Sequence, residues 1–122
     1  MPMSRRILRI AIPTKRQGGL KDVVSDVFGR ANTFTILEVE KGAIKSVKML
    51  ENPAASYGHG AGPIVVKMLI DSEVNMVIAA EFGPGASELL EHHKITMILV
   101  EANIAVAKAI KEALSKLSEP NL

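Results

Sequence analysis

The stretch IVVKMLIDSEVNMVIAAEFGPGASELLEHHKITMILVE, Ile64–Glu101, decides the fold because four segments of alternating pattern follow one another in it. Ile64–Glu73 and Gly85–Lys94 have the composition and spacing of helices, whereas Val74–Glu81 and Ile95–Glu101 are almost wholly apolar and predict strands. Strands that are apolar on both sides and alternate with helices are typical of a parallel sheet covered on both faces. The segment therefore predicts an α/β core.

The residues before this stretch predict a hairpin beside the parallel strands. Ile7–Pro13 is apolar, β-branched and ends at a proline, which fits a buried strand. Asn32–Glu40 and Ala43–Leu50 alternate in polarity around a turn centred on Lys41-Gly42, so we expect an antiparallel pair. Val23–Gly29 is expected to form a turn or two of helix that Gly29 ends.

A closing helix is predicted over Asn103–Leu117, with Asn103 as its N-cap. Its apolar face is expected to comprise Ile104, Ala107, Ile110, Leu114 and Leu117. The whole pattern predicts a single three-layer α/β/α domain over residues 7–117, flanked by tails at residues 1–6 and 118–122.

The composition limits the possible functions. The 122 residues suffice for one domain, and the 48% of hydrophobic residues include only three Phe and one Tyr, which disfavours an aromatic platform for single-stranded nucleic acid. With no cysteine, the chain has no disulfide, thiolate nucleophile or thiolate metal ligand. The N-terminus makes a poor signal peptide, so we expect a cytoplasmic protein.

Charge is concentrated in the first quarter of the chain. Residues 1–30 contain seven Lys or Arg residues against two aspartates. This segment can attract an anion, although a solvated tail and loop would have the same composition. Nucleic-acid binding through Arg5, Arg6 and Arg9 is the less favoured use of this charge.

Two glycine-proline pairs precede the helices that follow strands. Pro63 and Pro84 are each expected at the first helical position, where the missing N–H leaves no donor unsatisfied. Helices that follow parallel strands begin at one edge of the sheet, where their free N–H groups suit an anion and where α/β proteins usually bind ligands. Binding and pure helix architecture explain the pairs equally well.

One histidine lies in the glycine-rich loop NPAASYGHGAGP, Asn52–Pro63. His59 is either an exposed loop residue or a ligand for a guest, and Tyr57 can donate a hydrogen bond nearby. The glycines that permit close approach of a guest are Gly58, Gly60 and Gly62. His92 and His93, at the end of a predicted helix, are expected to be a solvated pair.

No arrangement of residues predicts an enzyme. GHGAG is similar to a dinucleotide fingerprint, with Glu81 at the distance of a ribose-binding acid, but NPAASY separates it from the preceding strand. The chain has no Walker A lysine, no carboxylate inside the first strand for a two-metal site, and no distinctive Ser-His-Asp spacing. We therefore expect a non-catalytic protein.

Several ordered motifs resemble the dinitrogenase iron–molybdenum cofactor biosynthesis family. They are IAIP, FGRA followed by TF, ENP, HGAGP and GPGA, and the similarity extends over about residues 7–117. That family includes small nitrogenase accessory proteins and the C-terminal domain of the cofactor-assembly radical enzyme. The resemblance implies a ribonuclease-H-like fold, namely a mixed five-stranded sheet whose second strand is antiparallel.

The resemblance also implies a carrier that holds an anionic iron–sulfur or iron–molybdenum cofactor precursor and passes it to a cofactor-assembly partner. The binding residues implied in this chain are His59, as the metal ligand, with Gly58, Gly60, Gly62, Gly83, Gly85, Arg30 and Lys15. The glycines would expose helix N-termini, and the two cations would suit a negative cluster.

One position departs from the family pattern. Nitrogenase-associated members often carry a histidine immediately before FGR, the natural cluster ligand, but this chain has Val27, which cannot coordinate iron. Oxygen donors from Asp26 or Glu81 are poor partners for soft iron–sulfur centres. The alternative function is a regulatory or scaffolding module that binds a small phosphate-like anion or a protein partner without metal. We expect a monomer, or a homodimer through an edge strand of the hairpin.

Overall fold

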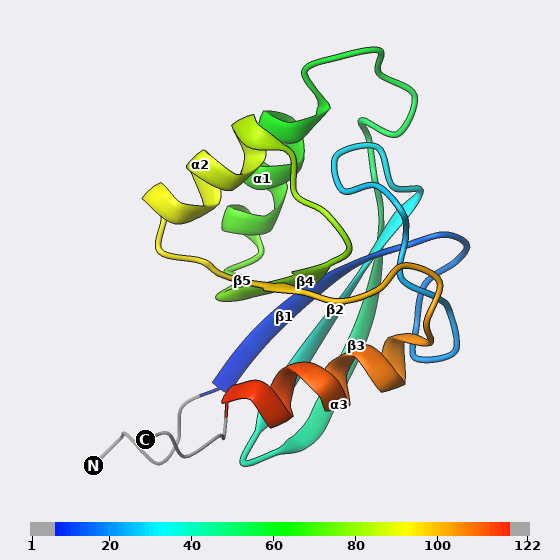
Figure 1. The fold of residues 1–122 in the computed structure, drawn as a ribbon, viewed down its shortest axis with the longest axis vertical. Helices are drawn as coiled ribbons and strands as arrows, with labels where there is room; N and C mark the ends of the chain where they lie inside the picture. Colours follow the sequence, from blue (N-terminus) through cyan, green and yellow to red (C-terminus); the bar gives the residue numbers. More distant parts are fainter. Residues whose placement is uncertain (1–6, 118–122) are drawn as a thin grey trace.

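The computed structural model describes residues 7–117, which form a five-stranded sheet between two layers of helices (Figure 1). The sheet order is β3-β2-β1-β4-β5, with β2 antiparallel to both of its neighbours and β1, β4 and β5 parallel. The predicted mixed sheet with an antiparallel second strand is confirmed. In chain order the elements are β1 (Ile7–Thr14), β2 (Thr33–Glu40), β3 (Ala43–Glu51), α1 (Ala61–Asp71), β4 (Met76–Ala79), α2 (Pro84–His92), β5 (Thr96–Leu99) and α3 (Val106–Leu117).

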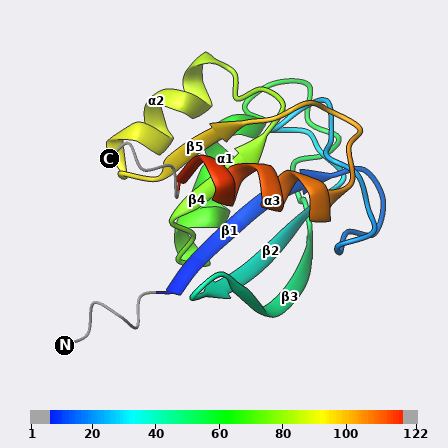
Figure 2. The same cartoon turned by 60° about the horizontal axis from the view of Figure 1, so that its bottom comes forward.

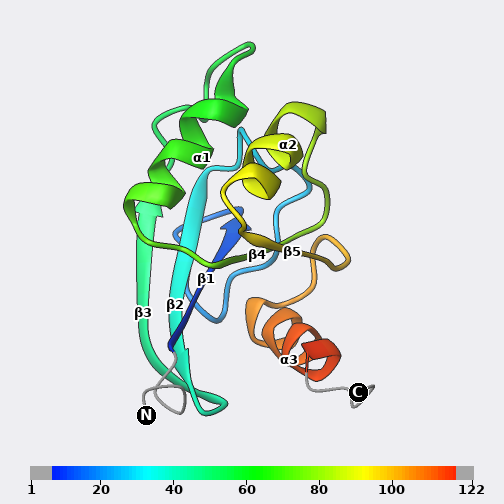
Figure 3. The same cartoon turned by 90° about the vertical axis from the view of Figure 1, so that its left-hand side faces the viewer.

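The helices cover opposite faces of the sheet, α1 and α2 on one and α3 on the other (Figure 3). Figure 2 shows α3 lying across the sheet, with the β2–β3 hairpin extending beyond it. Alternate residues of the central strands enter the two layers because successive strand side chains point to opposite faces. In β4, for example, Val77 packs with α1 and α2 whereas Ile78 packs with α3. The three-layer architecture is thus confirmed.

The hairpin turn and the strand at the opposite edge follow from local chemistry. Lys41 and Gly42 have φ angles of 54° and 79°, and a two-residue turn with positive φ at both positions matches the twist of paired strands. β5 is the outermost strand, and its Leu99 is 58% exposed. The prediction that this strand is apolar and covered on both sides therefore holds only for part of it.

The helix predicted at Val23–Gly29 is wrong. Val23 and Val24 instead form isolated β-bridges with Ala105 and Thr14, and the Val24 N–H donates to the Ile104 carbonyl at 2.9 Å. An α-helix needs N–H donors bound to carbonyls four residues earlier. Here the N–H groups of Val24, Ser25 and Phe28 donate to distant segments, so no helix forms.

The closing helix begins later than predicted, and Asn103 is not its N-cap. α3 starts at Val106, while Asn103 has a φ of 69° and accepts a hydrogen bond from the Lys15 ammonium through its side-chain oxygen. The buried face also differs from the predicted one, because Ala107 and Leu117 are exposed. The buried residues of α3 are Val106, Ala109, Ile110 and Ala113.

The two proline-associated helix starts differ. α2 begins at Pro84 as predicted, directly after Gly83. α1 begins at Ala61, so Pro63 is its third residue rather than its first, which corrects the prediction. A proline is tolerated there because the first four N–H groups of a helix have no partner within the helix.

No helix within residues 7–117 combines the length and apolar character needed to cross a bilayer. The predicted tails, with Arg5 and Arg6, lie outside the described residues.

Candidate functional site

Both glycine-led helix starts open on one cavity of about 350 Å³. Its wall is formed by the start of α1, by Glu81–Gly83 and the start of α2, and by two loop segments, Val27–Arg30 and Gly58–His59. The loops after β3 and β4 thus meet the segment between β1 and β2 at this edge. The two helix starts lie at one edge of the sheet, as their glycine-proline pairs predicted, and the Val27–Arg30 segment joins them there.

The two helix N-termini present backbone groups without side-chain caps. Gly60 and Gly83 are the N-cap residues, with φ angles of 80° and 75°, and neither helix has a side-chain cap bond or an acidic residue in its first turn. A Cβ placed on Gly62 would lie 3.6 Å from the Ala86 Cβ, so the helix starts touch. Their free N–H groups therefore converge on a small region of the cavity wall.

The segment Phe28–Arg30 packs tightly against the start of α1 and against Phe82. Phe28 is fully buried and its ring packs against Phe34 and Phe82, with centroids 5.5 Å and 5.7 Å away. A Cβ on Gly29 would lie only 3.1 Å from the Gly62 nitrogen, so a glycine is needed for this approach to α1. The segment is an ordered wall rather than a free loop.

Asn52 ties the wall to the loop that follows β3. Its side-chain amide donates to the carbonyls of Gly29 and Ala31 at 2.9 Å and 2.8 Å, and its oxygen accepts from the Ala54 N–H at 2.9 Å. We did not identify Asn52 as a site residue from the sequence. Its place beside Pro53 in the ENP motif was the available signal, but the sequence does not say which carbonyls it would bind.

The cavity is lined by one cation and one anion. Arg30 is exposed and, within residues 7–117, has no ion-pair partner. Glu81 accepts the Phe28 N–H at 2.9 Å through one carboxylate oxygen. Lys15 lies apart from the cavity lining, in a neighbouring cavity, where its ammonium contacts Asp26 at 2.7 Å. The hydrogen bond and charge of Lys15 hold the pKa of Asp26 below its usual value.

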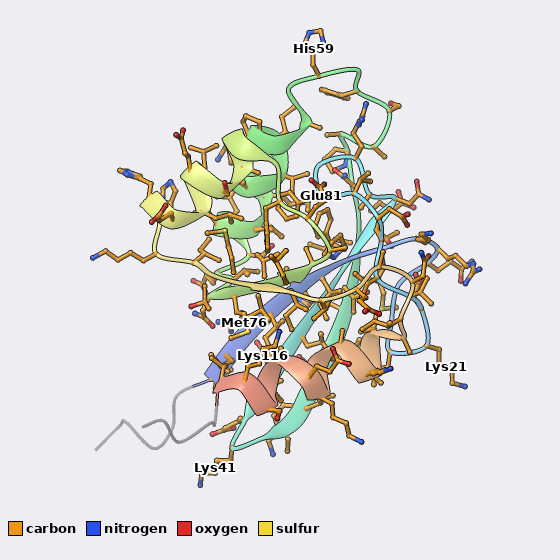
Figure 4. The ribbon with its side chains drawn as sticks, viewed as in Figure 1. Lys21, Lys41, His59, Met76, Glu81 and Lys116 are labelled. Carbon is orange, nitrogen blue, oxygen red and sulfur yellow. The ribbon has the colours of Figure 1, made fainter. Side chains whose placement is uncertain are left out.

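His59 lies at the mouth of the cavity. It is exposed at the tip of its loop, and its ring points away from the body of the protein in Figure 4. Val27, 38% exposed, lines the same cavity. Of the predicted glycines, Gly58, Gly62, Gly83 and Gly85 line the cavity, and Gly60 caps α1.

The other histidines lie elsewhere. His92 and His93 are exposed at the C-terminal end of α2, with ring centroids 5.2 Å apart, whereas the cavity lies at the N-terminal end of that helix. Within the part of the chain that the structure describes, no three His, Asp or Glu side chains gather in a way that could hold a metal ion. A guest in the cavity thus meets one imidazole, backbone N–H groups, a guanidinium and the Glu81 carboxylate.

Comparisons with known proteins identify similar chains. Over 81 residues the chain is 32% identical to MJ0580 of Methanocaldococcus jannaschii, an uncharacterized protein, covering 66% of this chain and 64% of that one. The chain thus spans less than two thirds of the curated relative that it matches.

Two solved structures are similar over most of their length. The apo form of the orange protein from Desulfovibrio gigas has a TM-score of 0.79 and 26% identity, covering 92% of this chain and 91% of that one. The NMR structure of TM1290 from Thermotoga, reported as a candidate NifB protein of the DUF35 family, has a TM-score of 0.71 and 36% identity, covering 89% and 88%. A family model described as dinitrogenase iron-molybdenum cofactor matches residues 6–116, and the chain therefore belongs to that family.

Proposed function

We propose that the protein is a non-catalytic carrier that binds an anionic iron–sulfur or iron–molybdenum cofactor precursor in the cavity between the starts of α1 and α2. The observation that carries the proposal is the convergence of two uncapped helix N-termini on one cavity beside the unpaired Arg30. Free N–H groups and a nearby guanidinium both favour a negative guest. Family membership supports a role connected with this cofactor.

The donor set favours holding a guest over transforming it. His59 is the one imidazole at the cavity, and its exposed position on a glycine-flanked loop lets the ring turn inward as a ligand. The remaining polar groups are backbone amides and the Arg30 guanidinium, which favour an anion, and the Glu81 carboxylate, which already accepts the Phe28 N–H. A single protein ligand leaves the guest free to be passed to a partner, and the similarity to a protein solved in an apo form fits such exchange.

Anaerobic reconstitution with iron and sulfide tests the proposal. After desalting, we expect visible absorption and retained iron in the wild-type protein and a clear loss of both in His59→Ala and Arg30→Ala. The matched control is the double variant His92→Ala/His93→Ala, which removes two imidazoles at the far end of α2 and should retain the cluster. Wild-type protein that retains no cluster, or a control that loses it as fully as His59→Ala, contradicts the proposal.

The alternative, a module that binds a phosphate-like anion without metal, is favoured by the same amide groups and by Val27 at the position of the family histidine. A thermal-shift screen separates the two functions. Stabilisation by phosphate-bearing ligands that persists in Arg16→Ala, a position outside the lining of this cavity, together with no response to iron and sulfide, supports the alternative.

A further inference from the structure

A second cavity, of about 420 Å³, adjoins the one proposed to hold the precursor. It is formed by Lys15 and Arg16 after β1 and by the segments Ser25–Val27 and Arg30–Asn32 before β2. Val27 and Arg30 line both cavities, so the two share a wall. The cavity proposed for the precursor does not use Lys15, Arg16 or Ser25.

The second cavity has an excess of positive charge. Lys15 and Asp26 pair at 2.7 Å and neutralise each other. Arg16 and Arg30 are exposed, and within residues 7–117 neither side chain has an ion-pair or hydrogen-bond partner. The nearby acid Asp22 is buried, and its carboxylate accepts N–H groups of the surrounding loop. Two arginines without such a partner therefore line one cavity.

Neutral donors complete the lining. Ser25 is only 5% exposed, and its oxygen accepts the Val27 N–H at 3.2 Å, while no hydrogen bond within residues 7–117 uses its hydroxyl hydrogen. A buried hydroxyl with an unused donor at a cavity wall points to an acceptor on a ligand. The side chains of Asn32 and Thr33 donate to the backbone carbonyls of Lys15 and Arg16, which fixes the backbone of these two residues.

We propose that this second cavity binds the dianionic phosphate group of a small phosphorylated metabolite. Guanidinium groups match phosphate oxygens in a bidentate geometry, and two of them balance two negative charges. The Ser25 hydroxyl supplies a third donor. The volume is within the range of small-molecule sites and leaves room for a group larger than a bare phosphate.

The shared wall couples the two cavities. Arg30 cannot neutralise a phosphate and a cluster at the same time, and two anions separated by one residue repel each other. Since coupling between sites is reciprocal, a phosphate ligand weakens the hold on the precursor as much as the precursor weakens the hold on phosphate. Binding of the phosphate ligand therefore promotes release of the cofactor precursor. This coupling, unlike the phosphate site itself, rests on the proposed carrier function.

Calorimetric titration of the full chain with inorganic phosphate and with glucose 6-phosphate, at low salt, tests the site. We expect saturable one-to-one binding that is about tenfold weaker in Arg16→Ala and also weaker in Ser25→Ala. The control Lys41→Asn removes a cation from the hairpin turn, far from the cavity (Figure 4), and keeps a residue that tolerates positive φ. Circular dichroism of each variant checks that it is folded.

Further outcomes separate this inference from the carrier function. Phosphate binding that survives in His59→Ala, and that lowers cluster retention about fivefold in reconstituted wild-type protein, supports both the site and the coupling. If neither the wild-type protein nor any variant retains a cluster but phosphate binding still depends on Arg16, the carrier function fails and the phosphate site stands. Phosphate binding that depends on His59 and not on Arg16, or that weakens equally in Lys41→Asn, overturns the inference.

Discussion

Replacing Asn52 by alanine should destabilise the fold and open the wall of the candidate cavity. The side chain is 7% exposed and makes three hydrogen bonds of 2.8–2.9 Å, to Gly29, Ala31 and Ala54. A hydrogen bond contributes about 1 kcal/mol net, and a buried group left without a partner costs about 1–3 kcal/mol. Because Gly29 is only half-buried and water can reach its carbonyl, we expect a total loss of about 3 kcal/mol.

Urea unfolding followed by circular dichroism measures this loss. With a denaturant slope near 2 kcal/mol per molar, the midpoint should fall by about 1.5 M, and the melting temperature by about 10 °C. The control is Asn32→Ala, which removes an exposed asparagine that donates one hydrogen bond, to the Lys15 carbonyl, and should cost about 1 kcal/mol or less. If Asn52→Ala is no more destabilising than Asn32→Ala, the role assigned to Asn52 is wrong.

Three further predictions follow from the same region. Burial raises the pKa of Asp22, but the N–H groups of the surrounding loop outweigh this effect and lower the pKa below 3.8. Asp22→Asn should therefore lower the free energy of unfolding by about 1–2 kcal/mol near pH 7. The difference from wild type should vanish in acid-unfolding curves as pH falls below about 3.8, where the carboxylate becomes protonated. Gly29→Ala should lower the free energy of unfolding by about 1–3 kcal/mol, because the new Cβ would lie 3.1 Å from the Gly62 nitrogen. Gly62→Ala should change it by less than about 1 kcal/mol, because its Cβ would lie 3.6 Å from the Ala86 Cβ. The reverse order in thermal melts would count against the close packing. Val27→His should increase the iron retained after reconstitution by adding a second imidazole at the cavity, compared with Val27→Ala, and equal iron in the two variants would argue against a cluster there.

The alternation of apolar strands and helices after Ile64 was enough to predict the layered sheet, and the Lys41-Gly42 pair was enough to place the hairpin. Both signals are local, because strand periodicity and positive φ act within a few residues. The errors occurred where distant segments decide the backbone. Val23 and Val24 pair with residues on two other parts of the chain, and no local pattern distinguishes such bridges from a short helix.

The candidate cavity was predictable in outline but not in its charges. The glycine-proline pairs predicted the start of α2 at Pro84 and a shared edge for both helices, whereas α1 begins at Ala61, two residues before the predicted Pro63. Whether Lys15 reaches that edge depends on Asp26 and Asn103, which hold its ammonium in the neighbouring cavity instead. Partner choice among exposed charged side chains depends on three-dimensional placement, which the sequence does not contain.

The absence of cysteine is consistent with a carrier, because the donors of the cavity would hold a guest more weakly than the ligands of a permanent metal site. Thiolate ligands hold a cluster by strong metal–sulfur bonds, whereas the N–H groups and Arg30 of the proposed site would hold an anion by interactions that salt and competing charges weaken. The Phe28 N–H already has an acceptor in Glu81, so this donor is satisfied when the cavity holds no guest. A guest that accepts this N–H must first displace the Glu81 carboxylate. The free energy gained from the contact is then the difference between the interaction of the N–H with the guest and its interaction with the carboxylate. A small difference of this kind suits a guest that has to leave again.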